Sequence, residues 1–167
     1  STSDSVVIYK EADGCLRVLD PTYGNAETVP GANVYLVNAI PLSDPSLIKT
    51  DAPALVLDQT LFGVEPAHGW CYYYTKAELA RQKNDWQEII RLMVEANALG
   101  YQPADPFEWL PYIEAQAMLG NFEAAEKLSV ELMRDEKRIN QGLCQVWKRV
   151  QAQVPVGSDT ESQIRNI

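Results

Sequence analysis

The chain has 167 residues, a net charge of −9 and a hydrophobic fraction of 46%, which suits one or two folded domains and argues against a disordered segment. Nucleic-acid backbones and anionic membrane surfaces repel so acidic a chain, so we expect neither as a partner. The sequence contains no apolar run of about 18 residues and no visible signal peptide, so membrane attachment would require a tether outside it.

The first 69 residues read as a β-hairpin followed by an extended segment. Two strand-like runs, 6–9 and 15–19, flank an Asp13-Gly14 dipeptide that favours a hairpin turn. Residues 32–37 are predicted as a third strand, and Pro45 suits the first position of a single helical turn. Residues 54–57 form an apolar run whose type the pattern leaves open. Frequent prolines exclude long helices between residues 20 and 69, so this segment is expected to wrap over the rest of the chain.

Residues 70–154 read as stacked helical hairpins. Trp86 and Phe122 are 36 residues apart, and each follows a turn-prone pair. We predict front helices at 70–82 and from 105, back helices at 85–99 and 122–136, and a closing helix at 139–150 that covers the last hairpin. Trp86 and Phe122 are expected in equivalent buried positions between front and back helices.

The helix ends carry their own sequence patterns. Asp85 and Asp105 are predicted N-caps, and Gly100 is predicted to end the first back helix in the left-handed conformation. Pro111 removes a backbone amide, so the second front helix should kink or begin with a loose turn.

Gly120, Phe122 and Ala125 have the spacing of small and aromatic residues that characterises the tetratricopeptide repeat, and Trp109 matches its front-helix aromatic. The first unit departs from the pattern, with Asn84 replacing the glycine. Residues 70–154 therefore resemble that family, which implies antiparallel hairpins with a concave binding face. The predicted fold class is α+β, mainly α, with a segment at 1–69 packed on the helices, a tetratricopeptide-like domain at 70–154 and a flexible tail at 155–167.

The predicted binding surface consists of front-helix residues outside the apolar stripes. The set mixes aromatic, acidic and amide groups and suits a polar peptide or other protein partner, or a carbohydrate. Its members are Tyr74, Glu78, Arg81, Gln82, Glu108, Tyr112 and Gln116. Residues 20–69 could instead fill this groove and make the domain a closed spacer. The accessibility of Tyr74 and Tyr112 distinguishes the two possibilities.

The sequence offers few residues for a catalytic or metal site. His68 is the single histidine and lies close to Cys71, but a zinc site needs three or four ligands. We therefore predict no metal, no cofactor and no catalytic residue. Cys15, Cys71 and Cys144 are interpreted as small buried residues, and most carboxylates as solvated. The alternative is a small hydrolase or transferase using His68 with Cys71, or a carboxylate pair.

A second resemblance covers most of the chain. The blocks 15–21 and 62–82, followed by Asp85-Trp86, resemble the soluble carboxy-terminal part of bacterial multi-spanning membrane proteins of the dolichyl-phosphate-mannose mannosyltransferase type. The resemblance implies an extracytoplasmic, non-catalytic interaction or accessory domain, tethered to a membrane glycosyltransferase-like protein. The absence of an initial methionine agrees with a piece of a longer chain.

Overall fold

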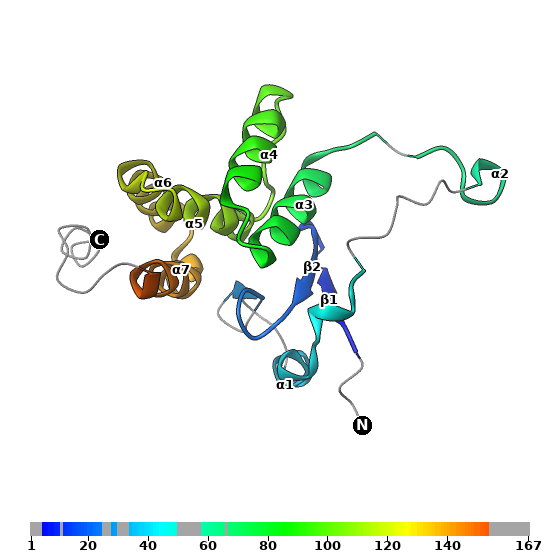
Figure 1. Cartoon of the computed structure of the whole chain (residues 1–167), viewed down its shortest axis with the longest axis horizontal. Helices are drawn as coiled ribbons and strands as arrows, with labels where there is room; N and C mark the ends of the chain where they lie inside the picture. Colours follow the sequence, from blue (N-terminus) through cyan, green and yellow to red (C-terminus); the bar gives the residue numbers. More distant parts are fainter. Residues whose placement is uncertain are drawn as a thin grey trace.

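The structure is a computed structural model that describes residues 5–10, 12–24, 28–29, 34–49, 58–65 and 67–153. It is mainly helical, with a small antiparallel sheet near the amino terminus (Figure 1). The predicted class, α+β and mainly α, is therefore confirmed.

The predicted β-hairpin is present. Strand β1 (Val7–Lys10) pairs antiparallel with β2 (Leu16–Leu19), with Val7 opposite Leu19. Leu19 is fully buried and forms a small core with Val29 and Ile40. The sheet therefore has a hydrophobic centre of its own.

The third strand predicted at 32–37 is wrong for residues 34–37, and residues 32 and 33 lie outside the described residues. Val34–Ala39 form the helix α1, followed by a 3₁₀ turn at Ile40–Leu42. Residue 43 lies beside the start of β1. Ser5, two residues before the strand, forms an isolated parallel bridge with Ser43, and the Val7 amide donates to Ser43 Oγ (2.9 Å). The expected turn at Pro45–Leu47 is present, and Asp44 caps it.

The chain then forms helical hairpins, as predicted. Figure 1 shows α3 beside α4, then α5 and α6, with α7 at the far end of the stack, and α5 contacts α4 on one side and α6 and α7 on the other. The elements are α2 (Gln59–Phe62), α3 (Trp70–Gln82), α4 (Trp86–Ala98), α5 (Leu110–Met118), α6 (Phe122–Asp135) and α7 (Asn140–Gln153).

The helix ends follow from local chemistry. The Asp85 carboxylate accepts the Glu88 amide, and Gly100 has a positive φ of 77°, so the predicted cap and stop of α4 are both confirmed. Asp105 caps a 3₁₀ turn at Pro106–Trp109 that precedes α5. That turn is the loose start expected from Pro111, whose ring nitrogen cannot donate a hydrogen bond.

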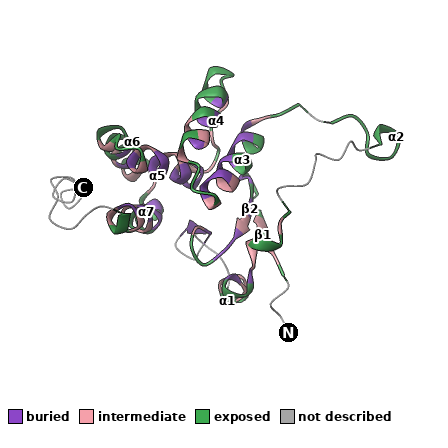
Figure 2. Cartoon of the chain, viewed as in Figure 1, coloured by how far each residue is buried: buried purple, intermediate pink, exposed green. Residues whose placement is uncertain are grey.

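Trp86 and Phe122 occupy equivalent positions, each as the first residue of a back helix, but both are only half-buried. The prediction that they are buried is wrong in this respect. The first residue of a helix lies at the end of the interhelical contact, and full burial starts one turn later at Ile89 and Ala125. Figure 2 shows that α4 combines buried, intermediate and exposed stretches.

Candidate functional site

The inner face of the hairpin stack is occupied by part of the amino-terminal region, which we call the inserted segment (residues 15–24 and 28–29). A disulfide between Cys15 and Cys71 joins this segment to the first turn of α3. Cys71 therefore has no thiol to act as a nucleophile with His68. The interpretation of all three cysteines as buried is wrong for Cys71 and Cys144, which are exposed.

Glu108 links the inserted segment to α3 beside this disulfide. Its carboxylate is fully buried and accepts hydrogen bonds from the Cys15 amide (2.7 Å) and from Trp70 Nε1 (2.6 Å). Burial raises the pKa of Glu108, although the two N–H donors oppose this shift. The expectation of a solvated face is wrong for this residue, because residues 15 and 70 cover it.

Arg17 of β2 holds the inserted segment at a second place. Its guanidinium forms an ion pair with Asp105 and donates to the Thr28 carbonyl oxygen (2.7 Å). The same side chain lies over the Phe107 ring, 5.9 Å from its centroid. Asp105 therefore both caps the turn before α5 and binds the inserted segment.

A group of buried and half-buried charges, which we call the ionic cluster (Glu78, Arg81, Glu114 and Arg149), lies beside Tyr23. Glu78 Oε2 lies 2.6 Å from Arg81 Nη2. The Glu114 carboxylate pairs with two arginines: its Oε2 lies 3.4 Å from Arg81 Nη1, and its Oε1 lies 2.6 Å from Arg149 Nε. The Tyr23 ring lies near both guanidinium groups, at 4.7 Å from Arg81 and 5.1 Å from Arg149. The cluster thus joins α3, α5 and α7 to the inserted segment.

Pairing keeps Arg81 charged. Burial by itself would lower the pKa of Arg81, but Glu78 and Glu114 hold it above its ordinary value. Arg149 also donates to the Thr22 carbonyl oxygen (3.2 Å). Removing one partner from such a group would leave an uncompensated buried charge, which is strongly destabilising.

The predicted binding residues do not form one open surface. Tyr74 is 3% exposed, and Arg81 and Glu108 are also buried. Glu78 is bound to Arg81 in the ionic cluster. Glu78, Gln82, Tyr112 and Gln116 are half-buried, and Gln116 Nε2 donates to Tyr112 Oη (2.7 Å). Of the two residues chosen to test the open groove, Tyr74 is buried and Tyr112 is partly accessible.

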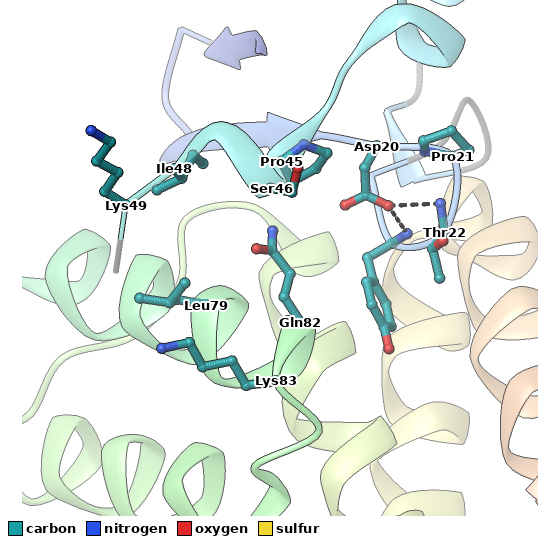
Figure 3. A pocket seen from close by; sticks show the side chains of 11 residues that line it. Asp20, Pro21, Thr22, Pro45, Ser46, Ile48, Lys49, Leu79, Gln82 and Lys83 are labelled. Carbon is teal, nitrogen blue, oxygen red and sulfur yellow. Dashed lines mark hydrogen bonds between the residues drawn. The ribbon is translucent and has the colours of Figure 1, made fainter. Parts of the chain in front are cut away.

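An open groove lies beside the ionic cluster. It has a volume of about 760 Å³ and runs between residues 20–23, residues 45–49 and the end of α3. Figure 3 shows Gln82 reaching from α3 toward Pro45 and Ser46, with Lys49 and Lys83 on its borders. A smaller apolar pocket of about 180 Å³, lined in part by Leu16, Val18, Ile48 and Leu79, continues it.

The sequence pattern identified a single lining residue of this groove, Gln82. The other walls come from residues 20–23 and 45–49, which lie far from α3 in the sequence. One wall is locally ordered, because Asp20 Oδ1 accepts the amides of Thr22 and Tyr23, both at 2.7 Å. No periodicity within α3 could have shown which distant loop covers its end.

His68 lies outside both features. Its Nε2 is 2.9 Å from Glu65 Oε1, and its ring stacks on Tyr72 with centroids 3.6 Å apart. Within the residues that the structure describes, no cluster of three or more His, Cys, Asp or Glu side chains is suited to hold a metal ion. Nor do those residues include a helix with the length and apolar character needed to cross a membrane.

Comparison with protein-family models, with curated proteins and with solved structures found no match.

Proposed function

We propose that this chain is a non-catalytic interaction or accessory domain of a larger, membrane-attached extracytoplasmic protein. The observation that supports this most directly is the use of its reactive side chains for internal contacts. Cys71 is bonded to Cys15, and Glu108 accepts two buried N–H groups. Glu78 and Glu114 are both paired with Arg81. Side chains used in this way hold a structure together and leave little for chemistry on a substrate.

The extracytoplasmic location is supported by the disulfide. Such bonds form and persist in oxidising compartments and are rare in the cytosol. Blocks 15–21 and 62–82 resemble the soluble part of mannosyltransferase-type membrane proteins. This resemblance supports a membrane glycosyltransferase-like protein as the parent. The resemblance to tetratricopeptide repeats supports a role in protein interaction.

The groove is the better candidate for binding a partner than the inner face of the hairpins. The inserted segment covers Tyr74 and Arg81, so the part of the inner face around these two residues is closed. The groove is open and combines amide, hydroxyl and ammonium groups with apolar side chains, and its volume is typical of ligand sites. A polar peptide or a carbohydrate remains the proposed partner class.

Counting free thiols tests whether the Cys15–Cys71 disulfide forms in an oxidising compartment. The chain is produced in an oxidising periplasm and in a reducing cytoplasm, and thiols are titrated after denaturation without reductant. The periplasmic protein should show one free thiol, that of Cys144, because Cys15 and Cys71 are paired. Three free thiols in the periplasmic product would contradict the proposal.

The reading frame of the gene tests the membrane attachment. We expect it to continue upstream of Ser1 into several membrane-spanning segments. A reading frame that encodes no such segment would overturn the attachment to a membrane enzyme, while leaving the disulfide result unaffected.

A further inference from the structure

A second pocket lies between the start of α4, helix α5 and the last turn of α7, and we call it the α7 pocket. It has a volume of about 500 Å³, which is within the range of small-ligand sites. Thr22 and Tyr23 line both this pocket and the groove. Figure 3 shows Thr22 at one end of the groove and Lys49 at the other. The α7 pocket therefore adjoins the groove at its Thr22 end.

The charged side chains that line the α7 pocket neutralise each other. Arg149 donates from Nε and Nη2 to the Glu114 carboxylate (2.6 and 2.8 Å) and from Nη1 to the Thr22 carbonyl oxygen (3.2 Å). No other described residue that lines the pocket carries a charge. A charged ligand would therefore meet no unpaired opposite charge in this pocket, which favours a neutral ligand.

The polar groups left for a ligand are uncharged. Within the described residues, no hydrogen bond engages the Thr22 hydroxyl, the Asn84 amide or the Trp86 indole N–H. The side-chain amide of Gln153, at the end of α7, is likewise not bonded to any described residue. Together these groups offer both donors and acceptors, and the half-buried Trp86 ring adds an apolar surface.

A neutral carbohydrate matches this combination. A sugar ring carries hydroxyls that both donate and accept hydrogen bonds, and its C–H groups can pack on an aromatic ring. An extended peptide would need an open sheet edge, a helical peptide an apolar groove and a phosphorylated peptide unpaired arginines. The walls here are mostly helices, Met118 and Ala152 are the aliphatic side chains among the described lining residues, and Arg149 is paired.

We propose that the α7 pocket binds one residue of a neutral oligosaccharide whose chain continues past Thr22 and Tyr23 into the groove. The amides of Asn84 and Gln153 bond to the sugar hydroxyls, and one face of the sugar ring packs on Trp86. This inference rests on the proposed binding role of the groove and narrows its partner class to carbohydrate. It does not depend on the membrane attachment.

An NMR titration of the isotope-labelled 167-residue chain tests the proposal. The probes are the neutral hexasaccharides maltohexaose, cellohexaose and mannohexaose. At least one of them, at about millimolar concentration, should shift the indole resonance of Trp86 and the side-chain amide resonances of Asn84 and Gln153. The backbone resonances of Thr22 and Gln82 should shift with them, because the sugar chain continues into the groove.

Two variants test the contacts that define the pocket. Asn84→Gly removes the amide but accepts the positive φ of 56° at this position, so the variant should fold. Gln153→Ala changes an exposed residue at the end of α7. Each should weaken sugar binding by about threefold to tenfold, the effect of one lost hydrogen bond. Gln141→Ala is the matched control, because Gln141 is an exposed amide of α7 that lines neither the pocket nor the groove.

The outcomes separate this proposal from the proposed function. A sugar that shifts only groove residues and binds Asn84→Gly normally would overturn the α7 pocket and leave the groove as a binding site. Decaproline that shifts the Trp86 resonance when no sugar does would overturn the carbohydrate class and leave an interaction role. A chain that binds neither probe would contradict both this proposal and the groove as the binding site.

Discussion

At the scale of single residues, Glu108 has the largest expected effect, because its carboxylate serves two buried donors. We predict that Glu108→Ala lowers the free energy of unfolding by roughly 2–4 kcal/mol, since each unpaired buried donor costs about 1–3 kcal/mol. Urea denaturation measures this. Glu131→Ala, at an exposed position of α6, is the control and should stay within about 0.5 kcal/mol of wild type. A similarly small loss for Glu108→Ala would contradict the geometry.

Glu108 also makes stability depend on pH. Burial raises its pKa above the ordinary value of 4.5, so the folded state holds this proton more tightly than the unfolded state. The stability that it contributes is fully present below the ordinary value and is lost as the pH rises through the folded-state pKa. The difference in unfolding free energy, wild type minus Glu108→Gln, should therefore decrease as the pH rises from the ordinary value of 4.5 through the raised folded-state pKa. A constant or growing difference would show that the folded-state pKa is not raised.

At the scale of elements, each back helix is anchored one turn after its first residue. Ile89 is fully buried, whereas Trp86 is half-buried. We predict that Ile89→Ala costs about 2–5 kcal/mol, as for other buried aliphatic residues. Trp86→Ala and Phe122→Ala should each cost about 1–2 kcal/mol, roughly half the benefit of complete burial. Thermal and urea denaturation of the three variants measure how much unfolding free energy each one loses. A larger loss for Trp86→Ala than for Ile89→Ala would contradict the prediction.

At the scale of the whole molecule, the Cys15–Cys71 disulfide spans 56 residues and ties the inserted segment to α3. Replacing both cysteines by serine should lower the free energy of unfolding by about 2–4 kcal/mol, because the unfolded chain gains freedom. Hydrogen exchange should rise in residues 16–24, while α4 and α6, which lie outside the loop, stay protected. Cys144→Ser is the control, since Cys144 forms no disulfide. An unchanged exchange rate in residues 16–24 would show that the ionic contacts hold the segment without the disulfide.

Much of the helical region could be predicted from the sequence, because its determinants are local. The predicted front helix 70–82 matches α3, and the caps at Asp85 and Asp105 and the stop at Gly100 are where the pattern placed them. N-caps, left-handed glycines and apolar periodicity act within one or two turns of chain. The β-hairpin was predictable for the same reason, from Asp13-Gly14.

The failures involve contacts between distant parts of the chain. Residues 34–37 are apolar enough for a strand but lie in helix α1, and it is Ser43 that contacts the start of β1. Glu108 and Glu114 look like solvated helix residues, and only the inserted segment, α3 and α7 bury and pair them.

The sequence by itself therefore determined where the hairpin and the helices begin and end, since hydrogen-bonded caps and side-chain periodicity are short-range properties. Only the tertiary structure decided which cysteines pair, which charges are buried, and that the inner face is filled while a groove opens beside it. These features depend on which distant segment covers each helix face, and the packing of the whole chain determines that segment.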